Sequence, residues 1–210
     1  SDLSQVPGLE HPQTIFEPRL QKRLNVEGFR LPPVIPERAP GRPALNGDKL
    51  VGRRFPTWLQ CPRCDVIKPA HRWGNKPGDP SRWCAPCSRK TAGDRNRVYV
   101  FPVRFIAVCE RGHLSDFPWD RWVGHRDSCD KNKRELKLSS EGRAGLAGLL
   151  LRCTACSASR SMDDAFRADA LRTHCKGERP WLAKDDESCD KMLRGSQRGA
   201  SNLYFPLLVS

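Results

Sequence analysis

The sequence lacks long hydrophobic runs. No apolar stretch approaches the roughly twenty residues that a membrane-spanning helix needs, because arginine or lysine interrupts each of the longer ones. The first residues, Ser1 to Ser4, have neither a basic start nor an apolar segment, so they do not form a secretory signal. The chain starts with serine rather than methionine and its last residues resemble an interrupted strand, so we expect a fragment of a longer protein.

Familiar catalytic motifs are also missing. The sequence has no Gly-Lys-Ser/Thr phosphate-binding loop, no Gly-x-Ser-x-Gly elbow and no His-Glu-x2-His helix. His113 and the nearby Asp116 leave one enzymatic alternative, a zinc- or magnesium-dependent nuclease acting on foreign DNA. Asp116 serves equally well as a helix cap, and no catalytic residue is assigned. The sequence favours a protein that is not an enzyme.

Apolar residues for a core are scarce. Hydrophobic residues make up 38% of the 210, and ten of these are cysteines. A structural zinc site contributes roughly 10–16 kcal/mol in small peptides, which is comparable with the whole net stability of a domain. We therefore expect bound metal to stabilise the fold in place of a large apolar core.

The spacing of the cysteines favours zinc over disulfides. Three pairs have the form Cys-x2-Cys, namely Cys61/Cys64, Cys84/Cys87 and Cys153/Cys156. A two-residue gap lets a tight turn aim both sulfurs at one ion, whereas a disulfide across it is usually strained. The first pair follows the apolar stretch 55–60, and the second pair returns after nineteen residues. This order is typical of a zinc ribbon closed by four thiolates.

The remaining ligands allow more than one grouping. In one, Cys153 and Cys156 join Cys175 and Cys189, while Cys109-x3-His113 joins His125-x3-Cys129. In the other, Cys109 and Cys129 join Cys153/Cys156, and the last two cysteines are ordinary buried thiols. We expect two or three Zn²⁺ per chain. The candidate ligands are Cys61, Cys64, Cys84, Cys87, Cys109, His113, His125, Cys129, Cys153, Cys156, Cys175 and Cys189.

Local patterns predict short elements joined by long loops. We expect a helix over residues 15–25 capped by Thr14, a proline-rich loop over 31–47, and one or two strands over 97–109 broken at Pro102. Ser115 or Asp116 should cap one short helix and Ser161 another, and residues 146–152 should form a strand. The predicted fold class is α+β, with small irregular zinc-ribbon-like modules. The expected parts are residues 1–50, a zinc-ribbon module over 51–98, and a second Cys/His-rich module over 99–210.

Positive charge dominates the composition. The chain has 37 lysines and arginines against 24 acidic residues, a formal net charge of +13. Such an excess attracts the nucleic-acid backbone, and arginine forms bidentate contacts with phosphate. We therefore predict DNA binding through backbone contacts. The candidate contact residues are Arg89, Lys90, Arg95, Arg97, Arg126, Lys131, Lys133 and Arg134.

Several sequence blocks carry a resemblance to a known family. They are FPTWLQCPRC at 55–64, VFPVRF at 100–105, GHLSDFPW at 112–119, GLAGL at 145–149, RSM at 160–162, RPWL at 179–182 and RGASNLYFP at 198–206. In this order they resemble the DrmB family, a component of the bacterial DISARM anti-phage system. Glu110 and Arg111 depart from the more neutral residues of that family's pattern.

The resemblance implies a cytoplasmic bacterial defence protein that does not contact a membrane. It also implies assembly with a DrmA-like helicase or ATPase into a complex that binds DNA. The family's chains are much longer than this one, and no active-site residue is carried over from them.

Overall fold

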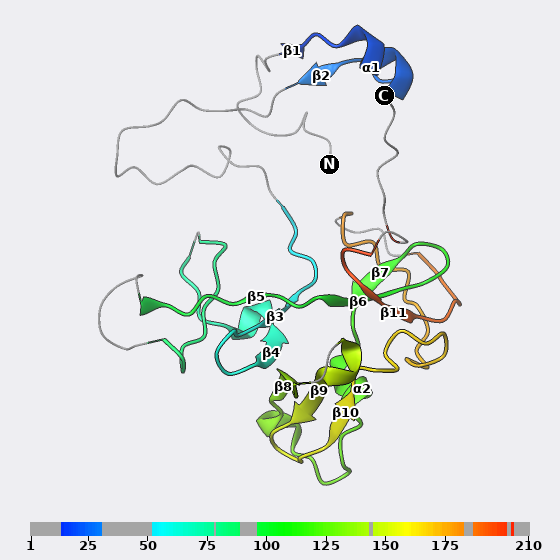
Figure 1. The fold of residues 1–210 in the computed structure, drawn as a ribbon. Helices are drawn as coiled ribbons and strands as arrows, with labels where there is room; N and C mark the ends of the chain where they lie inside the picture. The colour runs from blue at the N-terminus through cyan, green and yellow to red at the C-terminus, as the bar shows by residue number, and fades with distance from the viewer. Residues whose placement is uncertain are drawn as a thin grey trace. The chain divides into compact units, whose positions relative to one another are not determined.

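The computed structural model describes residues 14–30, 52–77, 79–88, 96–142, 145–182, 187–200 and 203 (Figure 1). Contacts divide the chain into two compact units, Ser1–Arg53 and Arg54–Ser210. No helix in these described ranges has the length and apolar character needed to cross a bilayer.

The first unit contains a small hairpin around one short helix. Strand β1 (Thr14–Ile15) pairs antiparallel with β2 (Phe29–Arg30), and α1 (Pro18–Leu24) lies between them in sequence. The predicted helix is therefore present but shorter, beginning at Pro18, where a missing N–H costs little. The predicted capping box is wrong, because the residue before the helix, Glu17, makes no side-chain capping bond. The proline-rich loop lies outside the described residues.

A six-stranded antiparallel sheet with the order β10-β9-β8-β4-β3-β5 forms much of the second unit. Its strands are β3 (Trp58–Gln60), β4 (Val66–Pro69), β5 (Phe101–Pro102), β8 (Leu136–Ser140), β9 (Leu149–Cys153) and β10 (Ser159–Ser161). Because β4 pairs with β8 and β3 pairs with β5, the sheet crosses the boundary that we expected at residue 98. The first cysteine pair therefore lies in the turn between two strands of this larger sheet, β3 and β4.

A second sheet of the same unit has three strands in the order β11-β6-β7. They are β6 (Phe105–Val108), β7 (Leu114–Asp116) and β11 (Arg194–Gln197), and α2 (Trp119–Val123) follows β7. The predicted strand over 97–109 is thus divided into β5 and β6. Val103 lies between them, buried, with its N–H on the Trp58 carbonyl oxygen at 3.1 Å.

The expected α+β class is wrong. The described residues form eleven strands in three antiparallel sheets and only two α-helices, so the protein is mostly β. The helix expected after Ser161 is a series of turns. The Ser161 hydroxyl accepts the Asp163 N–H instead of capping a helix, and Arg172 adopts a left-handed φ of 44°. The turns also pack on β11, where a Cβ on Gly195 would come within 2.1 Å of the Ala165 carbonyl oxygen. Tertiary packing therefore overrides the helical pattern.

Aromatic rings fill the larger core. The Phe117 and Trp119 ring centroids are 4.7 Å apart, and Phe105 meets Trp119 edge-on at 5.9 Å. Trp119 and Trp122 are buried on α2, as their three-residue spacing predicts. Several cysteines belong to the same buried cluster, including Cys153, which is fully buried. Six of the ten cysteines lie in or against this core, whereas the other four belong to a second, smaller buried cluster around Leu59 and Trp73.

Asp116 ties the two sheets of the second unit together. One carboxylate oxygen accepts the Thr57 N–H at 2.8 Å, and the other accepts the Thr57 hydroxyl. Thr57 directly precedes β3, whereas Asp116 ends β7. The expected role of Asp116 as a helix cap is wrong, because α2 begins after Pro118 without a side-chain cap.

We predict that Asp116→Asn lowers the free energy of unfolding by about 1–3 kcal/mol, because hydrogen bonds to a charged acceptor are lost. Urea denaturation followed by circular dichroism measures the change. Asp163→Asn is the matched control, since its side chain is exposed. Equal stability of the two variants would show that the link between the sheets contributes little.

Candidate metal centres

Three groups of four cysteine and histidine side chains meet in the second unit. In each group the ligand atoms all lie within 4.8 Å of one another. Cluster A is Cys61, Cys64, Cys84 and Cys87; cluster B is Cys109, His113, Cys175 and Cys189; cluster C is His125, Cys129, Cys153 and Cys156. The clusters contain all twelve candidate ligands that the sequence indicated. Each cluster could hold a metal ion.

The distances within the clusters fit a tetrahedral ion. Zinc bonds of about 2.3 Å to sulfur and about 2.0–2.1 Å to nitrogen place two sulfurs about 3.8 Å apart, and a sulfur and a nitrogen about 3.5 Å apart. The Cys64 and Cys84 sulfurs are 3.8 Å apart, and those of Cys129 and Cys153 are 3.9 Å apart. His113 Nδ1 lies 3.5 Å from the Cys175 sulfur. All ten cysteines are free thiols, so disulfides do not explain the proximity.

Clusters A and C are each built on a turn of the same geometry. The Cys61 N–H donates to the Val66 carbonyl, and Asp65, with a left-handed φ of 58°, donates back to the Cys61 carbonyl. The Cys153 turn repeats these bonds with Ala158 and Ser157, whose φ is also 58°. In both turns the first cysteine ends a strand of the six-stranded sheet or directly follows it. The Cys-x2-Cys spacing therefore predicts these local turns correctly.

Sheet pairing brings the halves of cluster B together. Cys109 and His113 flank the turn between β6 and β7. Strand β11 pairs with β6 so that Arg194 lies opposite Val108, which places the chain before β11 beside Cys109. The Cys175 N–H in turn donates to the Lys191 carbonyl at 2.8 Å.

Both groupings that the spacing suggested beyond cluster A are wrong. Cys175 and Cys189 join Cys109 and not Cys153/Cys156, and they are not isolated buried thiols. His125 and Cys129 instead complete the Cys153/Cys156 pair. Spacing identifies each local half of a site, but the second half depends on strand pairing that the local sequence does not encode.

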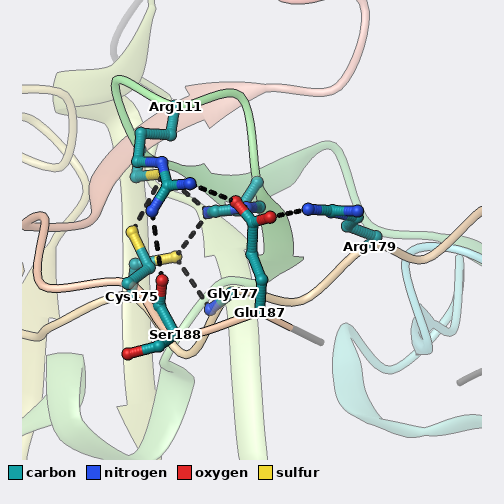
Figure 2. Close-up of polar contacts among 9 residues, drawn as sticks. Arg111, Cys175, Gly177, Arg179, Glu187 and Ser188 are labelled. Carbon is teal, nitrogen blue, oxygen red and sulfur yellow. Dashed lines mark hydrogen bonds and ion pairs between the residues drawn. The ribbon is translucent and has the colours of Figure 1, made fainter. Parts of the chain in front are cut away.

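A carboxylate fixes the orientation of His113. Its Nε2 lies 2.7 Å from Glu187 Oε1, and since a carboxylate only accepts, Nε2 carries the proton. Nδ1 is therefore left with its lone pair toward the three thiols of cluster B. Figure 2 shows Arg111 and Arg179 reaching the same carboxylate, with the Arg111 contact at 2.7 Å. This arrangement is typical of metal-binding histidines, whose second nitrogen is held by a carboxylate.

Cluster C has the same arrangement with a more exposed acid. His125 Nε2 lies 3.1 Å from Asp120 Oδ1 on α2, and His125 Nδ1 lies 3.5 Å from the Cys129 sulfur. Asp120 is about half exposed, whereas Glu187 is held by two arginines. Sequence analysis missed both acids. Sequence spacing could have identified Asp120, because it precedes His125 by only five residues. It could not have identified Glu187, which lies 74 residues after His113.

Burial raises the pKa of two thiols in cluster A, Cys64 and Cys84, and of one thiol in each of the other two clusters. It raises the pKa of Cys64 to about 11 and that of Cys175 to about 12. Burial also raises the pKa of Cys129. A bound dication would displace the protons from these thiols, so binding should release protons and weaken as the pH falls.

Backbone N–H groups lower the pKa of another thiol in each cluster. Those of Arg126 and Ala158 lower the pKa of Cys156 to about 6, and that of Lys191 lowers the pKa of Cys189 to about 7. In cluster A, burial opposes the effect, yet backbone hydrogen bonds still lower the pKa of Cys61. Cys156 and Cys189 therefore offer a thiolate near neutral pH as a first ligand in clusters C and B, and the lowered pKa of Cys61 favours its thiolate form in cluster A.

The predicted DNA-contact residues are only partly described. Arg89, Lys90 and Arg95 lie outside the described residues. Arg97 is partly buried, with its guanidinium 3.9 Å from the Trp83 ring centroid. The others lie near cluster C, where Arg126, Lys131 and Lys133 are exposed and Arg134 is partly buried.

We predict that Gly177→Ala disrupts cluster B. The Gly177 N–H donates to the Cys175 sulfur at 3.2 Å, and a Cβ would lie 1.6 Å from the Glu187 carbonyl oxygen. The variant should bind one zinc fewer per chain, as measured by elemental analysis. Gly142→Ala is the control, because Gly142 has a similar φ of 76° but no atom within 4 Å of its Cβ position. Equal zinc content in both variants would contradict this prediction.

We further predict that Glu187→Gln weakens one zinc equivalent about 10- to 100-fold, because the acceptor that orients His113 loses its charge. Competition with a chromophoric chelator measures this affinity. Glu110→Gln makes the same change at an exposed carboxylate 3.9 Å from Lys191 and should leave all equivalents unaltered. Indistinguishable titrations would mean that the Glu187 contact does not support the site.

Comparisons with known proteins give a consistent result. A family model described as a domain of unknown function, DUF8724, matches residues 3–205. The chain is also 34% identical over 129 residues to the DISARM protein DrmB of Bacillus paralicheniformis. That alignment covers 60% of this chain and 21% of the relative, so the chain spans about a fifth of the relative's length.

Proposed function

From the premise that this chain belongs to the DUF8724 family, we propose that it is a zinc-stabilised part of a bacterial anti-phage defence protein. Its role is to bind DNA and a helicase-like ATPase in the cytoplasm. The similarity to the DISARM protein DrmB supports the defence role. The ligand clusters support the zinc component, and the positive charge supports the DNA component.

The observation that carries the proposal is the presence of three four-ligand clusters with tetrahedral spacing. Four protein ligands leave no open coordination position, which is typical of structural zinc and not of catalytic zinc. Sulfur-rich ligand sets also favour zinc over magnesium or calcium, which prefer oxygen. The ions would therefore serve to hold the fold together.

Charge supports the DNA component. Three Zn²⁺ bring six positive charges against ten thiolates, so the net charge of +13 stays strongly positive. Arg126, Lys131 and Lys133 provide exposed cations beside cluster C. Backbone binding of this kind does not read sequence and weakens steeply with salt.

The motor activity belongs to the partner in this proposal. The sequence has no phosphate-binding loop of its own, so strand movement or unwinding would come from a DrmA-like ATPase acting in trans. This chain would hold the DNA while the partner hydrolyses ATP. Co-purification of the two chains is the direct measurement.

The structural contacts do not favour the nuclease alternative. His113 points its Nδ1 at cluster B, whereas Asp116 is occupied by Thr57. The two residues thus have separate partners, and a hydrolytic metal site needs an open position or several convergent carboxylates.

We predict that the purified chain contains three zinc ions, and that Cys64→Ser, Cys189→Ser and Cys156→Ser each reduce the count to two. Excess chelator should unfold the second unit, since metal binding is coupled to folding.

Labelled DNA should bind at 50 mM salt, and log affinity should fall linearly with log salt.

The zinc component and the DNA component of the proposal are tested by different results. A metal-free chain that stays folded in chelator would refute the structural role of zinc. DNA binding absent at 50 mM salt would refute the DNA component while leaving the zinc component intact. Cleavage of DNA with Mg²⁺ or Mn²⁺, abolished by Asp116→Asn under conditions in which circular dichroism shows that the variant remains folded, would support the nuclease instead.

A further inference from the structure

A pocket of about 690 Å³ lies against α2 and β10. Its remaining wall is the series of turns over residues 164–172, and α2 lies beside β10 (Figure 1). The pocket is lined by more cations than anions. The charged residues are Arg121, Arg160, Arg167, Arg172, Asp164 and Asp169.

Arg160 is held in place before any ligand binds. Its guanidinium carbon lies 3.6 Å from the centroid of the Trp122 ring, and its Nη1 approaches the Trp122 carbonyl at 3.5 Å. Trp122 is itself 2% exposed and packed in the core, so it offers a rigid surface. An arginine stacked in this way loses little freedom on binding, and its planar edge still presents N–H donors.

The acidic groups leave a net positive charge. Asp164 pairs with Arg167 at 3.1 Å, so these two largely neutralise each other. Arg121, Arg160 and Arg172 then face a single further carboxylate, Asp169. The guanidinium groups come from a helix, a strand and a turn, and all three arginines are exposed. An anion that enters the pocket would meet donors from several sides.

The backbone at Arg172 adds an independent sign of a ligand site. Its φ of 44° lies in the left-handed region, which residues other than glycine rarely adopt. Such backbone strain is concentrated at ligand sites and other functional positions. Leu171 is anchored in the core beside it, so the turn holds Arg172 at the rim of the pocket.

We propose that this pocket binds a phosphate of the nucleic-acid backbone. The inference rests on the proposed DNA binding and adds a specific contact site that lies outside the basic residues indicated by the sequence. Several arginine forks match the oxygen geometry of a phosphate diester. The open rim and the exposed arginines suit one phosphate of a long strand that continues over the surface.

The test is the double variant Arg121→Gln/Arg172→Gln, made in the 210-residue chain. We expect DNA affinity, measured by fluorescence anisotropy, to fall roughly tenfold at 100 mM salt. The slope of log affinity against log salt should become shallower by about 1–2, because about two phosphate contacts are lost. Zinc content and thermal unfolding should stay unchanged, since neither arginine is a cluster ligand.

Arg104→Gln/Arg152→Gln is the matched control. Both residues are exposed and do not line this pocket, and the variant loses the same charge. It should lose less than about threefold in affinity. Equal losses in the two double variants would overturn the pocket proposal while leaving DNA binding intact. Failure of the unaltered chain to bind DNA would instead overturn the proposed function.

Inorganic phosphate and pyrophosphate distinguish a free anion from the backbone of a strand. Weak competition with DNA by these ions, abolished only in the pocket variant, would support a phosphate contact within a longer binding path. Tight binding of the free ions, with DNA affinity unchanged in the pocket variant, would overturn the nucleic-acid assignment.

Discussion

Twelve cysteine and histidine side chains meet at three points, and each point joins segments that are distant in the sequence. The rest of the second unit is arranged around these junctions. Cluster A joins the β3–β4 turn to the loop after Trp83, and cluster C joins the segment after α2 to the β9–β10 turn. Cluster B connects the β6–β7 turn to residues 175–189. Cysteines also contribute to the buried core, so packing and ligand geometry depend on each other.

The acids that orient the two cluster histidines differ in how firmly they are themselves held. Glu187 is held by two arginines and by His113, whereas Asp120 is exposed and contacts His125 alone among the contacts described. Outer contacts of this kind orient ligands and tune affinity. Cluster B is accordingly the more firmly supported of the two. Cluster C lies next to α2, which also forms one wall of the arginine pocket.

Local sequence patterns predicted the structure reliably where it depends on residues close together in the chain. The Cys-x2-Cys turns, the buried face of α2 and the strand leading into Cys153 all depend on residues within a few positions of one another. Local patterns failed where contacts between distant segments determine the backbone conformation. Ser161 and its neighbours have a helical pattern, but the approach of Ala165 to Gly195 and the φ of Arg172 require turns. The pairing of ligand halves also requires the register between β11 and β6, which no local pattern provides.

The order of the cluster ligands along the chain has a consequence for biosynthesis. During translation, cluster A has all its ligands once residue 87 has been made, cluster C once residue 156 has been made, and cluster B only at residue 189. The nascent chain therefore extends 76 residues beyond His113 before the last member of cluster B is made, and every member of cluster C lies within that interval. A nascent chain that ends before Cys175 therefore holds only the half of cluster B on the β6–β7 turn, and Glu187, whose carboxylate orients His113, is made only two residues before the last cysteine of the cluster.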